Sequence, residues 1–130
     1  MPWISMAAVG GGAALGAWCR WALGAWLNPY FPSLPLGTLA ANLCGGLLIG
    51  LALELFSRTT AVPPELRLMV VTGFLGALTT FSTFSAEVVT ALRRADYLWA
   101  SATVGLHVLG SLLVTAMGMA LVFWLFRVNA

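Results

Sequence analysis

The chain has 130 residues, of which 61% are hydrophobic and only 8% are charged. Charged residues make up about a quarter of an ordinary soluble domain, so the composition excludes a water-soluble fold of this length. The net charge of +2 comes from six arginines against four acidic residues, which is too little and too scattered for a nucleic-acid-binding surface. We therefore expect an integral membrane protein with the lipid bilayer as its main solvent.

Four apolar segments are each long enough to cross the hydrocarbon core, which takes a helix of about 20 residues. The sequence predicts these spans at about 3–27, 36–57, 66–92 and 98–126. The proline-rich segment 28–35 ends the first span, and prolines at 63–64 suit the first turn of the third helix. We expect one all-α transmembrane domain, 1–130, with four membrane-spanning helices and short loops.

The six arginines are divided evenly between the two ends of the predicted spans. Three lie on the side of the amino terminus and three lean to the other side: Arg58, Arg67 and Arg127 against Arg20, Arg93 and Arg94. The excess of positive charge that normally fixes orientation is therefore missing. Such a chain could insert both ways up, and two opposed copies could pair about a two-fold axis in the membrane plane. A single orientation, set by a partner or by weak local bias, is the alternative.

In the first predicted span, small residues and one arginine share a helix face. Gly12, Gly16, Arg20 and Gly24 recur at a spacing of four. Because Arg20 lies near the end of the span, its long side chain could reach the interface and anchor the helix there. Attraction of an anion into a vestibule is the alternative role for its guanidinium.

The second predicted span carries a similar face. Thr38, Asn42, Gly46 and Gly50 recur every four residues, which combines a hydroxyl, an amide and a surface for close approach. Asn42 could donate to an ion, or it could join two helices, which is the commoner role of a lone asparagine in a membrane.

The third predicted span contains GFLGALTTFSTFSAE (73–87), which places hydroxyls and a carboxylate where lipid offers no partner. Gly73 and Gly76 lower helix propensity just before the midpoint of the span, and threonine hydroxyls can bond to backbone groups that a break releases. We predict a helix interrupted at the membrane centre, with exposed carbonyls that could bind a small hard cation between two opposed subunits. An unbroken helix with small residues at a packing surface is the alternative.

Beyond the predicted break, aromatic and polar side chains sort onto two faces. Phe81 and Phe84 lie on one side of a helix. The adjacent stripe consists of Thr80, Thr83 and Glu87. Ring edges carry the positive part of the aromatic quadrupole, so they can face a partly dehydrated anion to which the hydroxyls donate. Core packing is the alternative for the two phenylalanines.

The fourth predicted span also has a polar stripe. His107, Ser111 and Thr115 repeat every four residues, and Ser111 lies near the midpoint of the span. A polar pathway and a packing surface both remain open for this stripe. His107 could titrate, although a lone histidine is more often a hydrogen-bonded packing residue.

Three segments, GGGAALGAWCRW (10–21), GTLAANLCGGLLIG (37–50) and 73–87, resemble the signature segments of the Fluc/CrcB fluoride channels. The resemblance extends over the whole chain in length, span count and motif order, and the third segment is the most specific. It implies an antiparallel, dual-topology homodimer in the inner cell membrane. It also implies two fluoride pathways and a central structural sodium ion.

The resemblance further assigns roles to individual residues. The carbonyls of Gly76 and Thr79 would hold sodium together with a matching pair from the second subunit, and Phe81 and Phe84 would match the family's pair of pathway phenylalanines. Polar groups along the ion path would be those of Thr38, Asn42, Ser82, Thr83 and Ser111.

Three titratable or charged residues complete this assignment. Glu87 matches the acidic position after the serine-threonine run, and Arg20 matches the arginine of the vestibule. His107 departs from the pattern because it stands where the family's tyrosine is expected. Its imidazole N–H could still donate to the ion.

The predicted function is passive export of cytoplasmic fluoride. Selectivity would come from pore width and donor geometry, since the sequence has no ring of basic residues. No nucleophile, acid–base pair or metal-ligand cluster is recognisable, so an enzyme is not expected. One alternative is a proton-coupled exporter of the small multidrug-resistance class, although the first span lacks the carboxylate that class would need. The other is a non-conducting packing subunit of a larger membrane complex.

Overall fold

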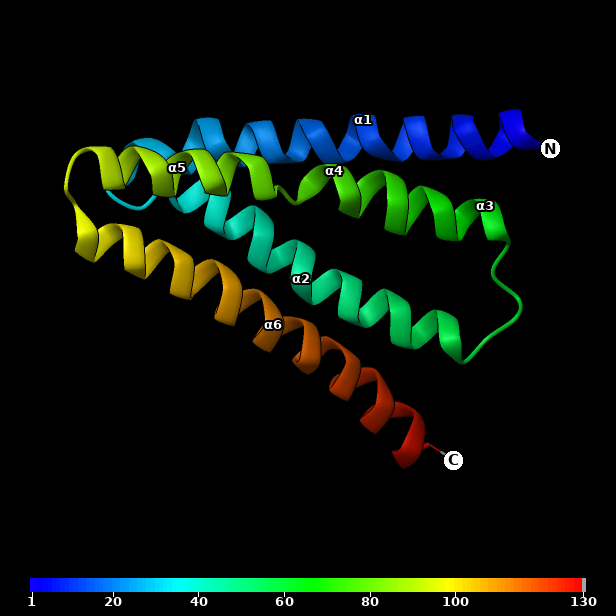
Figure 1. Ribbon diagram of the computed structural model, residues 1–130. Helices are drawn as coiled ribbons and strands as arrows, with labels where there is room; N and C mark the ends of the chain where they lie inside the picture. Colours follow the sequence, from blue (N-terminus) through cyan, green and yellow to red (C-terminus); the bar gives the residue numbers. More distant parts are fainter. Residues whose placement is uncertain (130) are drawn as a thin grey trace.

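The computed structural model describes residues 1–129, and this part of the chain contains helices and short connections without any β-strand. The three long helices are α1 (Pro2–Leu27), α2 (Leu36–Ser57) and α6 (Tyr97–Val128). A short 3-10 helix, η1 (Asn28–Tyr30), follows α1. Between α2 and α6 lie four shorter elements: α3 (Pro64–Arg67), η2 (Leu68–Leu75), α4 (Gly76–Leu78) and α5 (Phe81–Arg93). The helices run back and forth, and both termini lie at the same end of the bundle (Figure 1).

Three helical stretches among the described residues are long and apolar enough to cross a membrane. They are Leu36–Ser57, Pro64–Arg93 and Tyr97–Val128. Helix α1 has 26 residues but is not among them, because its glycines, its tryptophans and Arg20 lower its hydropathy. The expected all-helical membrane protein is therefore confirmed, whereas the fourth crossing, expected at 3–27, stays a prediction.

Helix α1 packs along η2 and α4 where two backbones approach closely. Gly12 faces the carbonyl of Met69, and Gly16 faces the carbonyl of Phe74. A Cβ atom at either glycine would overlap these backbone atoms, so only glycine allows the approach. The glycines of the first predicted stripe therefore form a packing surface.

Helices α2 and α6 run side by side and meet in the same way (Figure 1). Gly50 lies against the Thr115 carbonyl, and Gly118 lies against the Leu47 carbonyl. The Thr115 hydroxyl also donates to the Gly46 carbonyl at 2.8 Å. Gly46, Gly50 and Thr115 thus belong to the interface between these helices. They are the last members of the two predicted polar stripes, on α2 and α6.

The stretch before the break is not a regular α-helix. Leu68–Leu75 forms a π-helix, a wide and rare turn that often lies near functional sites. At its end, Leu75 packs together with Leu78 of α4 and Ala41 of α2 in a small buried core. No sequence pattern predicted the wide turn, because apolar side chains surround this stretch too uniformly to mark a change of helical period.

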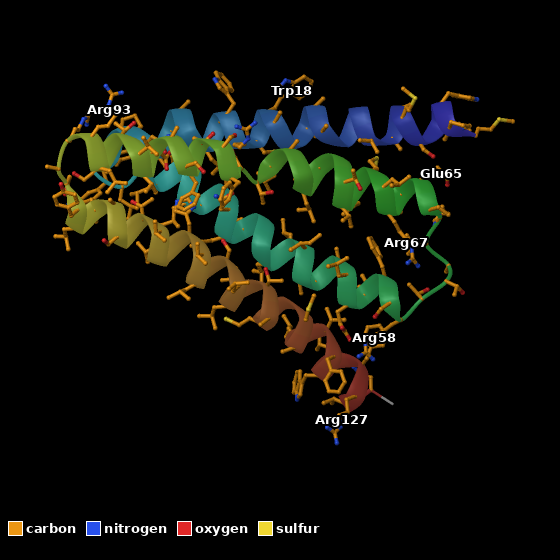
Figure 2. The ribbon with its side chains drawn as sticks, viewed as in Figure 1. Trp18, Arg58, Glu65, Arg67, Arg93 and Arg127 are labelled. Carbon is orange, nitrogen blue, oxygen red and sulfur yellow. The ribbon has the colours of Figure 1, made fainter. Side chains whose placement is uncertain are left out.

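The arginines outside α1 lie at the two ends of the bundle, as the sequence predicts. Figure 2 shows Arg58, Arg67 and Arg127 at one end and Arg93 at the other. This placement leaves neither end with a strong excess of positive charge. The dual orientation that we expect from this balance stays a prediction.

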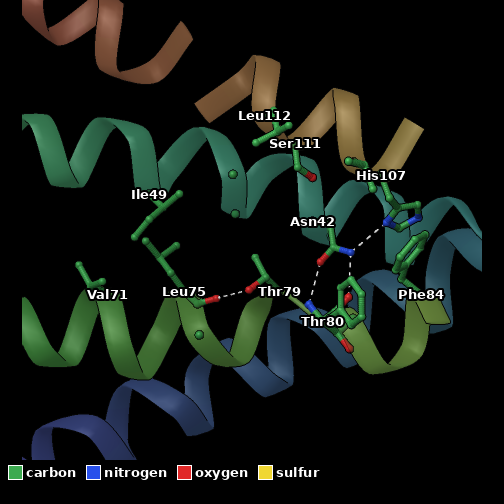
Figure 3. Close-up of a pocket in the computed structure, with 15 residues that line it drawn as sticks. Asn42, Ile49, Val71, Leu75, Thr79, Thr80, Phe84, His107, Ser111 and Leu112 are labelled. Atoms are coloured by element: carbon green, nitrogen blue, oxygen red, sulfur yellow. Dashed lines mark hydrogen bonds between the residues drawn. The ribbon is translucent and has the colours of Figure 1, made fainter. Parts of the chain in front are cut away.

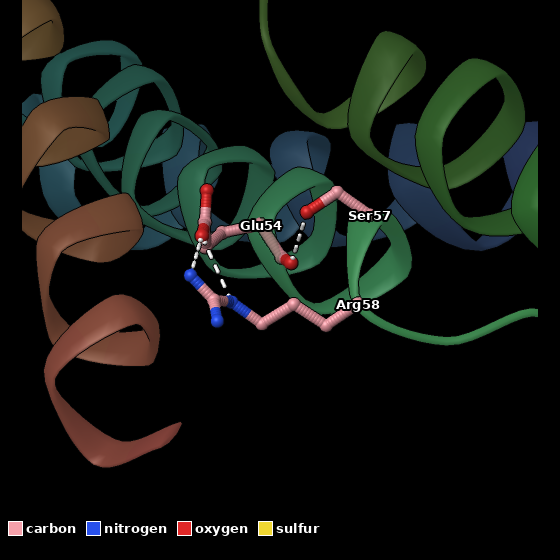
Figure 4. A network of polar contacts seen from close by, with 3 residues as sticks. All are labelled: Glu54, Ser57 and Arg58. Atoms are coloured by element: carbon pink, nitrogen blue, oxygen red, sulfur yellow. Dashed lines mark hydrogen bonds and ion pairs between the residues drawn. The ribbon is translucent and has the colours of Figure 1, made fainter. Parts of the chain in front are cut away.

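One of these arginines joins the ends of α2 and α6. The Arg58 guanidinium pairs with Glu54 at 2.5 Å, while the Ser57 hydroxyl donates to the Glu54 carbonyl at 2.7 Å (Figure 4). The same guanidinium lies over the rings of Phe123 and Phe126, at 5.2 and 5.3 Å from their centroids. Exposed ion pairs contribute at most about 1 kcal/mol, so this cluster aligns the helix ends more than it stabilises the fold.

Candidate functional site

The helix of the third predicted span breaks at two extended residues, which are visible as a thin link between α4 and α5 in Figure 1. Thr79 has φ −82° and ψ 155°, and Thr80 has φ −151° and ψ 121°. Their hydroxyls bond to the backbone on either side of the break. Thr79 Oγ1 donates to the Leu75 carbonyl at 2.9 Å, and Thr80 Oγ1 accepts from the Thr83 amide at 3.1 Å as the N-cap of α5. The predicted break is confirmed.

Asn42 of α2 clamps this break (Figure 3). Its Oδ1 accepts from the Thr80 amide at 2.7 Å, and its Nδ2 donates to the Thr80 carbonyl at 2.9 Å. The same Nδ2 lies 2.9 Å from Nδ1 of His107 on α6. Both hydrogens of the amide are therefore engaged, and Asn42 joins three helical elements. In this conformation it has no free N–H for an ion.

At the break, two backbone carbonyls lack the amide donors that an unbroken helix would give them. In an unbroken helix the Thr80 amide would bond to the Gly76 carbonyl, and the Thr83 amide to the Thr79 carbonyl. The two amides bond instead to Asn42 Oδ1 and Thr80 Oγ1. Gly76 and Thr79 both line the groove beside the break. The exposed carbonyls expected at the end of the first half-helix are thus present, and their binding of sodium stays a prediction.

The side chain of Arg20 reaches the end of α4, at the helix break. Its Nε donates to the Ala77 carbonyl at 2.9 Å, since side chains of a helix point back toward its amino terminus. Anchoring of α1 at the membrane interface and attraction of an anion, the two roles considered for Arg20, both stay predictions. Its positive charge lies at the carboxyl end of α4, where exposed carbonyls favour a cation.

The two phenylalanines contact each other but differ in burial. The centroids of Phe81 and Phe84 lie 5.4 Å apart with the rings inclined at 63°. Phe84 is buried and stacks on the His107 imidazole at 4.8 Å, whereas Phe81 is 77% exposed. The core-packing alternative therefore fits Phe84 but does not explain Phe81.

One turn after Phe84 on α5, Glu87 contacts α2, the second predicted span. Thr38 Oγ1 donates to Glu87 Oε1 at 2.5 Å. The other carboxylate oxygen, Oε2, is buried without a hydrogen-bond partner, and so is Nε2 of His107. Residues 1–129 contain no other buried side-chain nitrogen or oxygen in this state. A buried polar atom left unpaired costs about 1–3 kcal/mol, so an ion or a water molecule would bind favourably here.

Hydroxyls gather at the amino end of α5. Thr80 Oγ1 lies 3.3 Å from Ser82 Oγ and donates to Thr83 Oγ1 at 3.1 Å. Ser111 lies across the groove on α6. The structure therefore groups the hydroxyls of Thr80, Ser82 and Thr83 around the break and places that of Ser111 opposite them, while the Thr38 hydroxyl bonds to Glu87.

A groove of about 490 Å³ lies against the break, between α2, α6 and the η2–α5 stretch (Figure 3). Most of the predicted site residues line it: Asn42, Gly76, Thr79, Phe81, Phe84, His107 and Ser111. Thr83 and Glu87 line a second hollow of about 400 Å³ nearer the loops. The predicted pathway residues therefore divide between two hollows that both border α5, and Thr38, Arg20 and Ser82 line neither.

Sequence reasoning missed Thr103, which is buried and lines the second hollow. Its hydroxyl donates to the Trp99 carbonyl at 2.7 Å. The spacing of four residues between Thr103 and His107 could have identified it, because it extends the polar stripe of the fourth predicted span by one turn.

Residues 7–119 match the family described as CrcB-like protein, Camphor Resistance (CrcB). A protein named fluoride-specific ion channel FluC from Nitrosospira multiformis is 58% identical over 121 residues, which cover 93% of this chain and 94% of the relative. A protein of the same name from Thiobacillus denitrificans is 60% identical over 111 residues, 85% of this chain and 90% of the relative. The one from Pseudomonas putida is 54% identical over 121 residues, 93% of this chain and 95% of the relative.

These relatives carry the name of an ion channel, a class of proteins that are not enzymes, which confirms that part of the sequence prediction. Their similarity extends over nearly the whole chain and includes the membrane-capable helices. The protein is therefore a multi-pass membrane protein without enzymatic function, and it belongs to the CrcB-like family.

Proposed function

We propose that this protein is a passive, fluoride-selective channel of the inner cell membrane that exports fluoride from the cytoplasm and so lowers its toxicity. The observation that supports this most is the helix break, where hydroxyls, aromatic rings and unpaired polar atoms gather in a chain with relatives named fluoride-specific ion channels. The same polar groups would be costly in a helix that only had to contact lipid.

The amino end of α5 is suited to an anion that has lost part of its water. A helix amino terminus presents unpaired N–H groups and positive potential, and here the hydroxyls of Ser82 and Thr83 lie beside it. The rings of Phe81 and Phe84 stand on the same end of α5, and the hydroxyl of Ser111 lies across the groove on α6. Their ring edges and hydroxyls would take over contacts that water makes with fluoride in solution.

The carboxyl end of α4 is suited to a sodium ion. The carbonyls of Gly76 and Thr79 have lost their helical donors to side-chain oxygens and line the groove. The neighbouring carbonyls of Ala77 and Thr80 already bond to Arg20 and Asn42. Neutral carbonyl oxygens match the preference of a hard cation, so this donor set fits sodium. A bound ion would supply a fixed positive charge at the dimer centre.

The proposed assembly is an antiparallel homodimer in which each subunit crosses the membrane four times. One subunit offers two sodium-binding carbonyls, and a partner of opposite orientation would bring its own pair to the same place. Phe81, which is 77% exposed beside the groove, would then contact the second subunit. The even distribution of arginines supports insertion in both orientations.

Fluoride efflux from liposomes tests this function. Purified protein is placed in liposomes loaded with potassium fluoride, and valinomycin supplies the counter-current of potassium. We expect fluoride to leave while chloride stays inside. Efflux that depends on a proton gradient would favour a small multidrug-type exporter, and the absence of efflux would favour a non-conducting subunit.

A further inference from the structure

The arginines of this chain differ in whether the protein itself supplies their partners. Three of the six donate to carbonyl or carboxylate oxygens of the protein: Arg20, Arg58 and Arg67. Within residues 1–129, the guanidinium groups of Arg93 and Arg94 take part in no ion pair and no hydrogen bond. Both are exposed at the carboxyl end of α5, and Figure 2 shows Arg93 extending outward there. Their charges complement the helix dipole, but their N–H donors remain free.

The two arginines share a hollow with Thr90, which lies one turn earlier on α5. The hollow has a volume of about 300 Å³, and its lining within residues 1–129 contains no carboxylate. Pockets for small molecules begin at about this volume, which is more than a monatomic ion needs. Two guanidinium groups and one hydroxyl are all donors here. The hollow is therefore suited to an anion with several acceptor oxygens.

The length of α5 indicates the depth of this hollow in the membrane. The helix has 13 residues, from Phe81 at the break to Arg93, and extends for about 20 Å at 1.5 Å per residue. The hydrocarbon core reaches about 15 Å from the membrane centre, and the headgroup layer continues to about 20–22 Å. With the break at the membrane centre, as the sequence predicts, Arg93 and Arg94 lie at the level of the lipid phosphates. Thr90 then lies at the edge of the hydrocarbon.

Apolar side chains close to the pair along the chain are available to contact a lipid. Leu92, Tyr97 and Leu98 are 46%, 66% and 75% exposed. Tyrosine is typical of the boundary between hydrocarbon and headgroups, and the two leucines would lose nothing by facing acyl chains. A lipid whose phosphate occupied the hollow would therefore find apolar contacts nearby.

We propose that Thr90, Arg93 and Arg94 bind the phosphodiester headgroup of an anionic phospholipid. A planar guanidinium donates two parallel hydrogen bonds to phosphate oxygens, and its weak hydration makes it easy to desolvate. The headgroup should be anionic, because the cation of a zwitterionic lipid would face the same two guanidinium groups. In the antiparallel dimer proposed above, each face of the membrane would carry one such site.

Lipid binding to the wild-type protein tests this directly. Phosphatidylglycerol or phosphatidylcholine is added to the protein in detergent micelles, and bound lipid is measured by native mass spectrometry. We expect phosphatidylglycerol to bind at least about tenfold more tightly, since each arginine near the surface contributes about 1 kcal/mol of attraction for an anionic lipid. Inorganic phosphate at the same concentration should not displace it, because phosphate lacks the acyl chains. Equal binding of the two lipids, or displacement by phosphate, would overturn the proposal.

A matched pair of variants tests the arginines themselves. We expect Arg94→Gln to weaken the binding of phosphatidylglycerol at least about tenfold, the loss of one hydrogen bond to a charged group. Arg127→Gln removes the same charge from an exposed arginine of α6 that lines none of the hollows described, and it should change binding less than about threefold. Arg94→Lys keeps the charge without the paired hydrogen bonds and should lie between them. Equal loss in the two glutamine variants would indicate general surface attraction and overturn the site.

The rival role for this hollow is a mouth of the ion pathway, because Thr90 and Arg94 also line the second hollow. Fluoride efflux from liposomes of phosphatidylcholine alone separates the two roles, since no anionic lipid is then present. Lower efflux in Arg94→Gln, together with unchanged binding of phosphatidylglycerol, would assign the arginines to the pathway and overturn the lipid site. The lipid measurement needs no conduction, so this inference stands or falls separately from the proposed function.

Discussion

Two regions of this molecule join helices by opposite means. Where α2 meets α6 and where α1 meets η2, glycines bring the backbones into direct contact. At the break between α4 and α5, Asn42 and Arg20 join the helices through hydrogen bonds. Close packing leaves no space for another molecule, whereas polar clamps leave a groove and unpaired atoms. The comparison indicates that the glycine contacts form the rigid frame and the clamped break forms the site.

The largest effect is expected when a side chain enters a glycine contact. A Cβ atom at Gly50 would overlap the backbone of Thr115, whereas one at Gly105 would meet no atom within 4 Å. We expect Gly50→Val to destabilise the protein by about 3 kcal/mol or more, the upper range for overpacking, because backbone cannot move aside. Unfolding in mixed detergent micelles measures this. Gly105→Val is the matched control and should fold, and equal stability of the two variants would contradict the role given to the frame.

Removal of the clamp should affect conduction strongly. Asn42→Leu loses the bonds to Thr80 and His107. Three hydrogen bonds of about 1 kcal/mol each correspond to roughly a hundredfold, and we expect fluoride flux to fall by that factor. The Thr80 amide should also exchange its hydrogen faster. Asn42→Asp keeps the acceptor for that amide, so its exchange should remain slow while flux falls. Wild-type flux in Asn42→Leu would show that the clamp is dispensable.

The two phenylalanines should separate conduction from stability. We expect Phe81→Ile and Phe84→Ile to slow fluoride flux by about threefold to tenfold, which corresponds to the ~0.5–1.5 kcal/mol of aromatic edge contacts. Because only Phe84 is buried, Phe84→Ile should also lower the free energy of unfolding by about 1–3 kcal/mol. Phe81→Ile should change it by less than about 0.5 kcal/mol. Flux assays and unfolding curves on the same preparations measure both quantities, and wild-type flux in both variants would restore the packing interpretation.

The smallest effect is expected for Thr115, which lies in the frame although the sequence placed it on a polar stripe. Thr115→Val removes the bond to the Gly46 carbonyl but keeps the shape of the side chain. We expect a loss of about 1 kcal/mol in the free energy of unfolding and no change in fluoride flux. A large fall in flux would move Thr115 from the frame to the site.

Much of the fold could be predicted from the sequence because its signals are local. Long apolar runs, the prolines at 63–64 and the glycines beside two threonines located the helices and the break. The faces that carry Asn42 and Phe84 followed from helical spacing alone. These features depend only on neighbours along the chain.

The missed features depend on contacts between distant residues. The sequence predicts that Arg20 lies near the end of a span. Where its charge lies depends on the direction of its side chain and on the Ala77 carbonyl, to which it donates. Likewise, nothing local could show that Asn42 uses both of its hydrogens. Phe81 and Phe84 share a spacing, yet packing against α6 buries only Phe84.

The π-helix at Leu68–Leu75 makes the orientation of the break depend on how this stretch is wound. A π turn is wider than an α turn and takes in about one extra residue. Deleting one residue would remove this extra residue and keep the following helix in register, whereas rewinding the same eight residues as a regular α-helix would rotate everything after them by about 100°, the angle per residue of an α-helix. The carbonyls of Gly76 and Thr79 would then face away from the groove, even though every site residue was still present.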